Sequence, residues 1–98
     1  MDNKIVIFSK LGCLYCARTR TFFKSLNLQY TEINLNPNDN NYEYKKDRLF
    51  KYYNHNSYPI IVIDNKLIGG HSELLRSYDS HKLHKICNDI NLFVPFDN

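Results

Sequence analysis

Two cysteines three positions apart, Cys13 and Cys16, are the residues of this 98-residue sequence best suited to chemistry. A Cys-x-x-Cys pair can bind a metal, close a small disulfide, or exchange electrons with another thiol or disulfide. The chain has one further cysteine, Cys87. Three cysteines are too few, and an odd number, for a secreted disulfide scaffold. The sequence therefore favours a reducing compartment, and the cytoplasm is the expected location.

The position of the pair favours redox chemistry. An apolar run at residues 4–8 and a loop at 9–12 precede Cys13, and a helical pattern continues to residue 26. Cys13 is expected at or just before the first helical turn and Cys16 inside it, so that both sulfurs share one face. Unpaired N–H groups at a helix N-terminus favour thiolate over thiol, and Lys10 adds a cation. Cys13 is the predicted nucleophile, and the deeper Cys16 is the predicted resolving thiol.

Metal binding and a structural disulfide are the competing interpretations. A structural zinc site needs four ligands, commonly from two such pairs. Beside the pair, this chain offers only Cys87 and four scattered histidines. Cys87 shares a helical face with Leu83 and Ile86 and is expected in the core. A disulfide across three residues closes too small a loop to stabilise much, so redox exchange is favoured and no metal is expected.

The hydrophobic pattern predicts a single α/β domain over residues 1–98. Residues 4–35 follow a strand–helix–strand pattern with tight connections, which predicts a parallel strand pair with a right-handed crossover. The β-branched run from Ile60 and the turn pair Asp64-Asn65 predict a hairpin. We expect a four-stranded mixed sheet with helices on both faces and strands one and three central, in the order βαβα-ββαα. The strands are expected at 4–8, 29–35, 60–63 and 66–68, and the helices at 13–26, 42–53, 72–78 and 80–91.

Three details of this fold bear on the site. The run at 4–8 is continuous rather than alternating, so both faces of the first strand are expected to be covered. Ser72 and Ser80 are expected to cap the last two helices. Loops at the carboxyl ends of strands gather ligands in such sheets. The loop that holds Cys13 follows the first strand, so it lies where chemistry is expected.

Composition limits the possible partners. The net charge is +3 and the lysines are scattered, with only Lys45 and Lys46 adjacent, so no phosphate-tracking stripe is evident. The apolar run at 5–8 is too short for a signal peptide or a membrane span. A hydrophobic fraction of 43% is enough for a folded core. The sequence predicts a monomer that binds neither nucleic acid nor membrane.

Four segments give the chain a resemblance to the glutaredoxin family, which has a thioredoxin-like fold, over essentially its whole length. Residues 9–10 (Ser-Lys) and 13–16 (Cys-Leu-Tyr-Cys) resemble the family's Thr/Ser-Lys and Cys-Pro-Tyr-Cys. Residues 57–59 (Ser-Tyr-Pro) resemble its Thr-Val-Pro, and the next five resemble the strand that follows. Residues 68–73 (Ile-Gly-Gly-His-Ser-Glu) resemble its Ile-Gly-Gly-x-x-Asp/Glu. Four segments in the same order and spacing make the resemblance specific.

The resemblance implies an activity and a cosubstrate. It implies a glutathione-dependent oxidoreductase that reduces protein–glutathione mixed disulfides and protein disulfides. Cys13 would take the glutathionyl group or form the mixed disulfide, and Cys16 would resolve a mixed disulfide with a protein. The implied partners are glutathione and proteins that carry a glutathionyl group or a disulfide.

The resemblance also implies where the cysteinyl part of glutathione binds. A cis bond before Pro59 would bring the backbone groups of Tyr58 beside Cys13. There they would pair with the ligand like an added strand. Gly70 would permit a close backbone approach where a side chain would collide.

The resemblance further implies charged contacts with the two ends of glutathione. His71 and Ser72 would begin a helix whose N–H groups hold the γ-glutamyl carboxylate. Lys10 would meet the glycine-end carboxylate. The polar or basic residue that the family carries in its second helix falls on Lys46, with Arg48 as the fallback, and Tyr15 would form a wall of the site.

The chain departs from the family pattern at three positions. Leu14 replaces the usual proline between the cysteines, which should alter loop rigidity and thiolate formation. Tyr58 is bulkier than the usual valine. Ser72 carries no negative charge to meet the ligand's ammonium group, and Glu73 is the candidate for that role.

Two alternatives to a glutathione-dependent enzyme stay open. One is a thioredoxin-like electron donor that a flavoprotein reductase serves. The other is an iron–sulfur carrier, in which Cys13 and glutathione hold a cluster between two subunits. The cluster-carrying branch usually has a single active-site cysteine followed by Gly-Phe-Ser, which this chain lacks.

Overall fold

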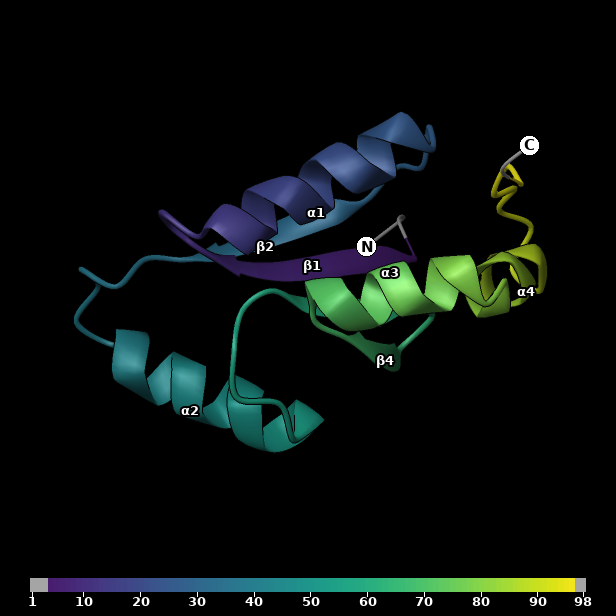
Figure 1. Ribbon diagram of the computed structural model, residues 1–98. Helices are drawn as coiled ribbons and strands as arrows, with labels where there is room; N and C mark the ends of the chain where they lie inside the picture. The colour runs from purple at the N-terminus through teal and green to yellow at the C-terminus, as the bar shows by residue number, and fades with distance from the viewer. Residues whose placement is uncertain (1–3, 97–98) are drawn as a thin grey trace.

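The computed structural model describes residues 4–96 and contains every element that the sequence predicts, with shifted boundaries (Figure 1). The strands are β1 (Ile5–Lys10), β2 (Thr31–Leu35), β3 (Ile60–Ile63) and β4 (Lys66–Gly69). The helices are α1 (Leu14–Ser25), α2 (Tyr42–Tyr53), α3 (His71–Asp79) and α4 (Lys82–Asn88). Among the described residues, no helix is both long and apolar enough to cross a membrane.

The four strands form one mixed sheet in the order β2-β1-β3-β4. β1 pairs in parallel with β2 and antiparallel with β3, and β3 pairs antiparallel with β4. Asp64 and Asn65 connect β3 to β4 with φ of 52° and 64°, a left-handed conformation that their side chains tolerate. The predicted mixed sheet, with its first and third strands in the centre, is confirmed.

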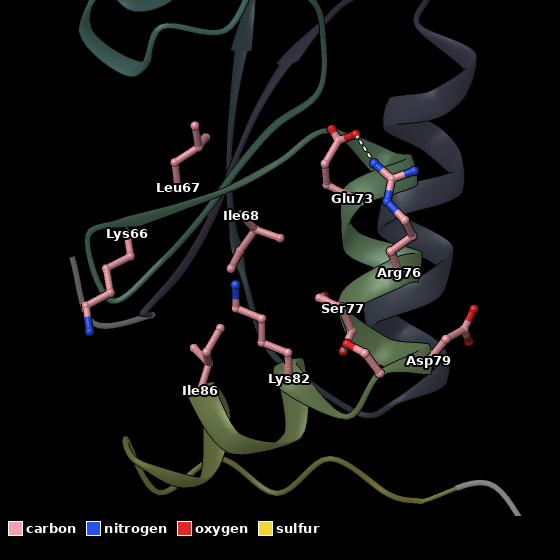
Figure 2. Close-up of a pocket in the computed structure, with 10 residues that line it drawn as sticks. Lys66, Leu67, Ile68, Glu73, Arg76, Ser77, Asp79, Lys82 and Ile86 are labelled. Carbon is pink, nitrogen blue, oxygen red and sulfur yellow. Dashed lines mark hydrogen bonds and ion pairs between the residues drawn. The ribbon is translucent and has the colours of Figure 1, made fainter.

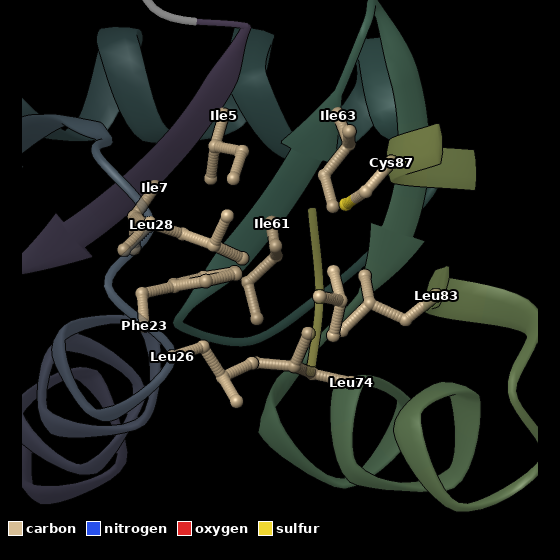
Figure 3. Packing of buried hydrophobic residues seen from close by; sticks show 11 residues of the cluster. Ile5, Ile7, Phe23, Leu26, Leu28, Ile61, Ile63, Leu74, Leu83 and Cys87 are labelled. Carbon is tan, nitrogen blue, oxygen red and sulfur yellow. The ribbon is translucent and has the colours of Figure 1, made fainter. Parts of the chain in front are cut away.

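One face of the sheet carries the hydrophobic core (Figure 3). Ile5 and Ile7 of β1 and Ile61 and Ile63 of β3 are fully buried there, as the two-residue repeat of a strand requires. They pack with residues from α1, α3, α4 and the segments beside these helices, namely Phe23, Leu26, Leu28, Leu74, Leu83, Cys87 and Val94. The predicted core position of Cys87 is confirmed. Burial of this apolar surface is the main driving force for folding.

The opposite face is covered by α2, so helices lie on both faces as predicted (Figure 1). Phe8 of β1 contacts Tyr53 of α2, with ring centroids 5.7 Å apart. No residue of α2 is buried, and β1 alternates between buried and half-buried positions. The prediction that both faces of the first strand are covered holds only in part, because α2 packs through half-buried aromatic rings.

The last two helices begin at residues other than the predicted serines. Gly70, not Ser72, is the N-cap of α3, because Glu73 Oε1 accepts a hydrogen bond from the Gly70 N–H at 2.7 Å. His81 precedes α4 with a left-handed φ of 64°. Ser80 ends α3 as its C-cap. Both cap predictions are therefore wrong, although both helices are present.

Candidate active site

The carboxyl end of β1 and the chain that enters β3 meet at one edge of the sheet. The antiparallel register pairs Phe8 with Ile60. Pro59, which precedes Ile60, therefore lies beside the part of β1 that continues to Lys10. The Lys10 ammonium lies 5.9 Å from the centroid of the Tyr58 ring. The Tyr58–Pro59 bond is cis, as predicted. The site is thus built by strand pairing between segments far apart in the sequence.

The two cysteines occupy the predicted positions at the start of α1. Cys13 is the N-cap, with extended backbone, and its Sγ accepts a hydrogen bond from the Cys16 N–H at 3.2 Å. Cys13 is half-buried, Cys16 is fully buried, and both are free thiols. The N-terminus of α1 therefore donates a hydrogen bond to the sulfur of Cys13, the more exposed of the two cysteines.

Cys16 is held in its protonated form. Burial, and after it the hydrogen bond with the Cys13 side chain, raises the pKa of the Cys16 thiol to about 11. A thiol attacks a disulfide only as thiolate. At neutral pH, Cys16 is therefore mostly in the thiol form, which does not attack a disulfide.

Tyr58 belongs to an aromatic cluster that connects the site to α2. Its ring lies 5.2 Å from that of Phe50, and its hydroxyl is 3.2 Å from the hydroxyl of Tyr42. Burial and the hydrogen bond with Tyr42 raise the pKa of Tyr58 above its ordinary range, so the phenol stays neutral. Lys46 lies 5.8 Å from the centroid of the Tyr42 ring, at the edge of the same cluster, and its ammonium forms an ion pair with Glu43 at 2.6 Å.

The start of α3 lies next to Pro59. A Cβ on Gly70 would stand 3.5 Å from the Pro59 carbonyl oxygen and 3.3 Å from Glu73 Oε1, so the backbones are close. Glu73 accepts hydrogen bonds from the Gly70 N–H and the Ser72 hydroxyl and pairs with Arg76. The Gly70 hydrogen bond is the main reason that the pKa of Glu73 is lowered. The carboxylate expected to meet a ligand ammonium is thus engaged in holding the helix start.

His71 and Tyr15 meet across α1 and α3, with ring centroids 5.8 Å apart. The Thr19 hydroxyl donates to the Tyr15 carbonyl at 2.8 Å and lies 3.0 Å from His71 Nδ1. A hydroxyl has one proton, so Nδ1 carries its own and donates to Thr19. Burial, together with the charge of Arg18, lowers the pKa of His71, which keeps the imidazole neutral. Tyr15 is 51% exposed, so its ring stands at the rim of the site.

Ser9 lies next to the site on β1, although the sequence predicts a loop at this position. It is fully buried on β1, and its hydroxyl donates to Glu32 of β2 at 2.7 Å. Glu32 also accepts a hydrogen bond from Arg20 of α1. Ser9 follows Ile5 and Ile7 at two-residue spacing, and that alternation is the signal that could have placed it inside.

Two cavities differ in their relation to the cysteines. One of about 730 Å³ lies between β4, α3 and α4 and is lined by residues such as Lys66, Ile68, Arg76 and Ile86, with no cysteine (Figure 2). Another of about 440 Å³ opens beside Cys13, and Lys10, Arg20 and Glu32 also line it. The second cavity is therefore the one that adjoins the candidate active site. No three His, Cys, Asp or Glu residues gather as a potential metal site within residues 4–96.

The sheet order and the paired thiols define a thioredoxin-like protein with a dithiol site. The comparisons with known proteins agree. A family model described as Glutaredoxin matches residues 5–68. A solved buckwheat glutaredoxin–glutathione complex has a TM-score of 0.82 at 25% identity, covering 94% of this chain and 83% of its own.

Curated relatives give the same result. "Glutaredoxin-2, mitochondrial" of Homo sapiens is 32% identical over 84 residues, which are 86% of this chain and 47% of the relative. "Glutaredoxin-C8" of Oryza sativa subsp. japonica is 31% identical over 88 residues, which are 88% of this chain and 64% of the relative. This chain belongs to the glutaredoxin family, as the resemblance predicted, and it spans about half the length of the mammalian relatives that it matches.

Proposed function

We propose that this chain is a glutathione-dependent thiol–disulfide oxidoreductase with Cys13 as nucleophile and Cys16 as resolving thiol. The contrast between the two sulfurs is the observation that carries the proposal. The Cys13 sulfur can be reached and accepts an N–H at the start of α1, which stabilises a thiolate. Cys16 is buried and keeps its proton, so it reacts after a disulfide has formed at the neighbouring sulfur.

The proposed reaction begins at a protein–glutathione mixed disulfide. The Cys13 thiolate attacks the glutathione sulfur, a new S–S bond forms, and the protein leaves as a thiolate that takes a proton from solvent. A second glutathione, as thiolate, then attacks the glutathionyl sulfur. This step frees Cys13 and releases glutathione disulfide. With a protein disulfide, Cys13 forms the mixed disulfide and Cys16 attacks the Cys13 sulfur to release the reduced protein.

Glutathione is the proposed cosubstrate because the groups around Cys13 suit a tripeptide, and a solved relative is described as a glutathione complex. The backbone of Tyr58 before Pro59 is proposed to pair with the cysteinyl part. Gly70 is proposed to permit a close approach of the ligand to the backbone, because it has no side chain that would collide. The N-terminus of α3, at His71 and Ser72, is proposed to hold the γ-glutamyl carboxylate.

Three further side chains are proposed to contact the ligand. Lys10, whose ammonium lies over the Tyr58 ring, is proposed to meet the glycine-end carboxylate. Lys46 is proposed as a second cation, and it must release Glu43 to take this role. Tyr15 is proposed as a wall of the groove.

Turnover of a glutathionylated peptide with glutathione and glutathione reductase tests the proposal. We expect Cys13→Ser to abolish turnover and Cys16→Ser to retain most of it, because only Cys13 is needed for glutathionyl transfer. Equal loss in both variants, or in neither, would refute the assignment. Activity with thioredoxin reductase but not with glutathione would support the reductase-served alternative. A brown, dimeric protein after purification without oxygen would support the cluster carrier.

We propose one domain over residues 1–98, a monomer in a cytosolic location, and glutathionylated or disulfide-bonded proteins as partners. Three cysteines are too few, and an odd number, for a secreted disulfide scaffold, which supports a reducing compartment. Sedimentation velocity and cell fractionation test the monomer and the location. Recovery in the mitochondrial fraction would replace the cytosolic assignment.

A further inference from the structure

The cavity of about 440 Å³ beside Cys13 lies between the end of β1, the start of α1 and the edge strand β2. Cys13 is itself part of the lining, so a group that forms a disulfide with Cys13 is next to this cavity. The groove proposed for glutathione uses Tyr58, Pro59 and Gly70, which lie outside the lining. The cavity and the proposed glutathione groove are therefore two separate surfaces beside one sulfur.

The part of the lining next to Cys13 is apolar. Leu11 is 50% exposed and Leu14 is 60% exposed. Gly12, between these leucines in the sequence, adds no side chain, and a Cβ there would meet no atom within 4 Å. Ala17 continues the surface along α1, because residues three apart share a helix face. Two exposed leucines beside a reactive sulfur indicate a surface that a partner covers.

The polar part of the lining has an excess of positive charge. Arg20 of α1 and Glu32 of β2 form an ion pair, so their charges cancel. Lys10 also lines the cavity and has no acidic partner within residues 4–96. Asn34 of β2 adds an uncharged hydrogen-bonding group. The remaining charge is that of Lys10, which attracts a carboxylate and repels an ammonium group.

We propose that this cavity binds the polypeptide beside the reactive cysteine of a protein disulfide when that cysteine is joined to Cys13. The segment that fits has an apolar side chain for Leu11 and Leu14 and a carboxylate for Lys10. Glutathione has no apolar side chain and cannot use the leucines. In a direct disulfide between Cys13 and a protein, no glutathione is bound, so Lys10 is free to meet the substrate. The inference rests on the proposed dithiol function.

The step that the cavity assists is balanced in atoms and electrons. The Cys13 thiolate attacks one sulfur of the substrate disulfide, and an S–S bond forms between Cys13 and the substrate. The substrate's own S–S bond breaks with its electron pair on the second sulfur, which takes a proton from solvent. The substrate disulfide is the oxidant, and Cys13 is oxidised.

Docking and thiolate reactivity have different effects on the rates. A substitution that changes the reactivity of the Cys13 thiolate changes its rates with a peptide disulfide and with a glutathione disulfide together. A substitution that removes contact with the polypeptide slows only the reaction with the peptide. The ratio of the two rates therefore isolates docking, even for Leu14, which lies next to Cys13.

The test compares two disulfides that share one leaving group. Thionitrobenzoate is joined to glutathione or to the single cysteine of a short peptide that has leucine and glutamate beside the cysteine. Stopped flow follows release of the coloured thionitrobenzoate thiolate by the full chain in the Cys16→Ser background. Leu11→Ser and Leu14→Ser are compared with Leu67→Ser. Leu67 is the matched control, because it is an exposed leucine of β4 outside this cavity.

We expect the ratio of the peptide rate to the glutathione rate to fall about fivefold in Leu11→Ser and in Leu14→Ser, because each loses apolar contact with the peptide. Leu67→Ser should leave the ratio unchanged. A peptide with lysine in place of the glutamate should react about threefold more slowly with the parent protein.

A ratio that stays unchanged in both leucine variants, or a faster reaction of the lysine peptide, would overturn the docking surface alone. A loss confined to the glutathione disulfide would assign the cavity to glutathione and would also overturn it. If the parent protein released no thionitrobenzoate from either disulfide, both the docking surface and the proposed function would be wrong.

Discussion

Cys16 and Cys87 are both fully buried thiols, and burial raises the pKa of each to about 11. Cys87 lies among apolar core residues, whereas Cys16 lies next to a second thiol, with its backbone N–H donating to the Cys13 sulfur at 3.2 Å. The two residues therefore differ in their neighbours rather than in their exposure. Cys13 is the more accessible sulfur of the pair, and Cys16 is the buried thiol that we propose to react after a disulfide has formed at Cys13.

Lys10 is predicted to affect binding more than turnover. In Lys10→Gln, we expect the KM for a glutathionylated peptide to rise about tenfold. This corresponds to about 1.4 kcal/mol, within the range of a hydrogen bond to a charged group. Steady-state kinetics measure the effect, and Lys10→Arg should restore most of the affinity.

Lys45→Gln is the matched control, because Lys45 is an exposed lysine of α2 outside the proposed groove. It removes the same charge without touching the site. An unchanged KM in Lys10→Gln, or an equal rise in Lys45→Gln, would contradict a specific contact between Lys10 and the ligand.

The sequence identifies the site residues that lie in short motifs, such as Cys13 and the cis Pro59. It does not identify partners that meet only through the fold. Ser9 and Glu32 are 23 positions apart, and Thr19 and His71 are 52 apart. Such contacts depend on strand register and helix packing, which local patterns do not encode.

At the level of secondary structure, the start of α3 depends on Glu73. In Glu73→Ala, we expect the free energy of unfolding to fall by about 1 kcal/mol, because the Gly70 N–H loses its partner at the helix start. Urea unfolding measures the change. Glu73→Gln keeps an acceptor at the same place and should lose less. Equal stability of wild type and Glu73→Ala would show that the cap contributes nothing.

The helices and strands themselves were predictable because their apolar periodicity spans many residues. Their ends were not, since single contacts decide them. α4 begins only after His81 adopts a left-handed φ, and no short-range signal at Ser80 or His81 predicts that. The turn at Asp64 and Asn65 was predictable because those residue types tolerate left-handed backbone.

At the level of the whole molecule, the chain after α4 returns to the core. Val94 is buried, and the Pro95 carbonyl accepts hydrogen bonds from the Tyr78 hydroxyl and His84 Nε2. The sequence predicts no structure for this segment, because it forms no regular element and its contacts reach back to α3 and α4.

Stability is predicted to fall in alkaline solution. The folded-state pKa of the Cys87 thiol is about 11, above its ordinary value of 9.0, so the folded state holds the proton more tightly. The stabilisation is complete below about pH 9 and is lost as the pH rises toward 11. For Cys87 alone the loss is about 2–3 kcal/mol.

Urea unfolding at pH 7 to 11 checks this in wild type and in Cys87→Ala. The variant should be less stable at pH 7, because a small cavity remains, yet its stability should decline less with pH. The tyrosines titrate in both proteins, so the difference between the two curves isolates Cys87. Parallel curves would contradict a raised pKa at Cys87.

The most direct test determines which cysteine sulfur forms a disulfide with glutathione. The Cys16→Ser variant, which cannot resolve an adduct, is incubated with oxidised glutathione at pH 7, and the modified peptide is located by mass spectrometry. We predict one glutathione per chain, attached at Cys13, with Cys87 unmodified because it is fully buried. No adduct, or an adduct at Cys87 that forms as fast as one at Cys13, would contradict the central claim.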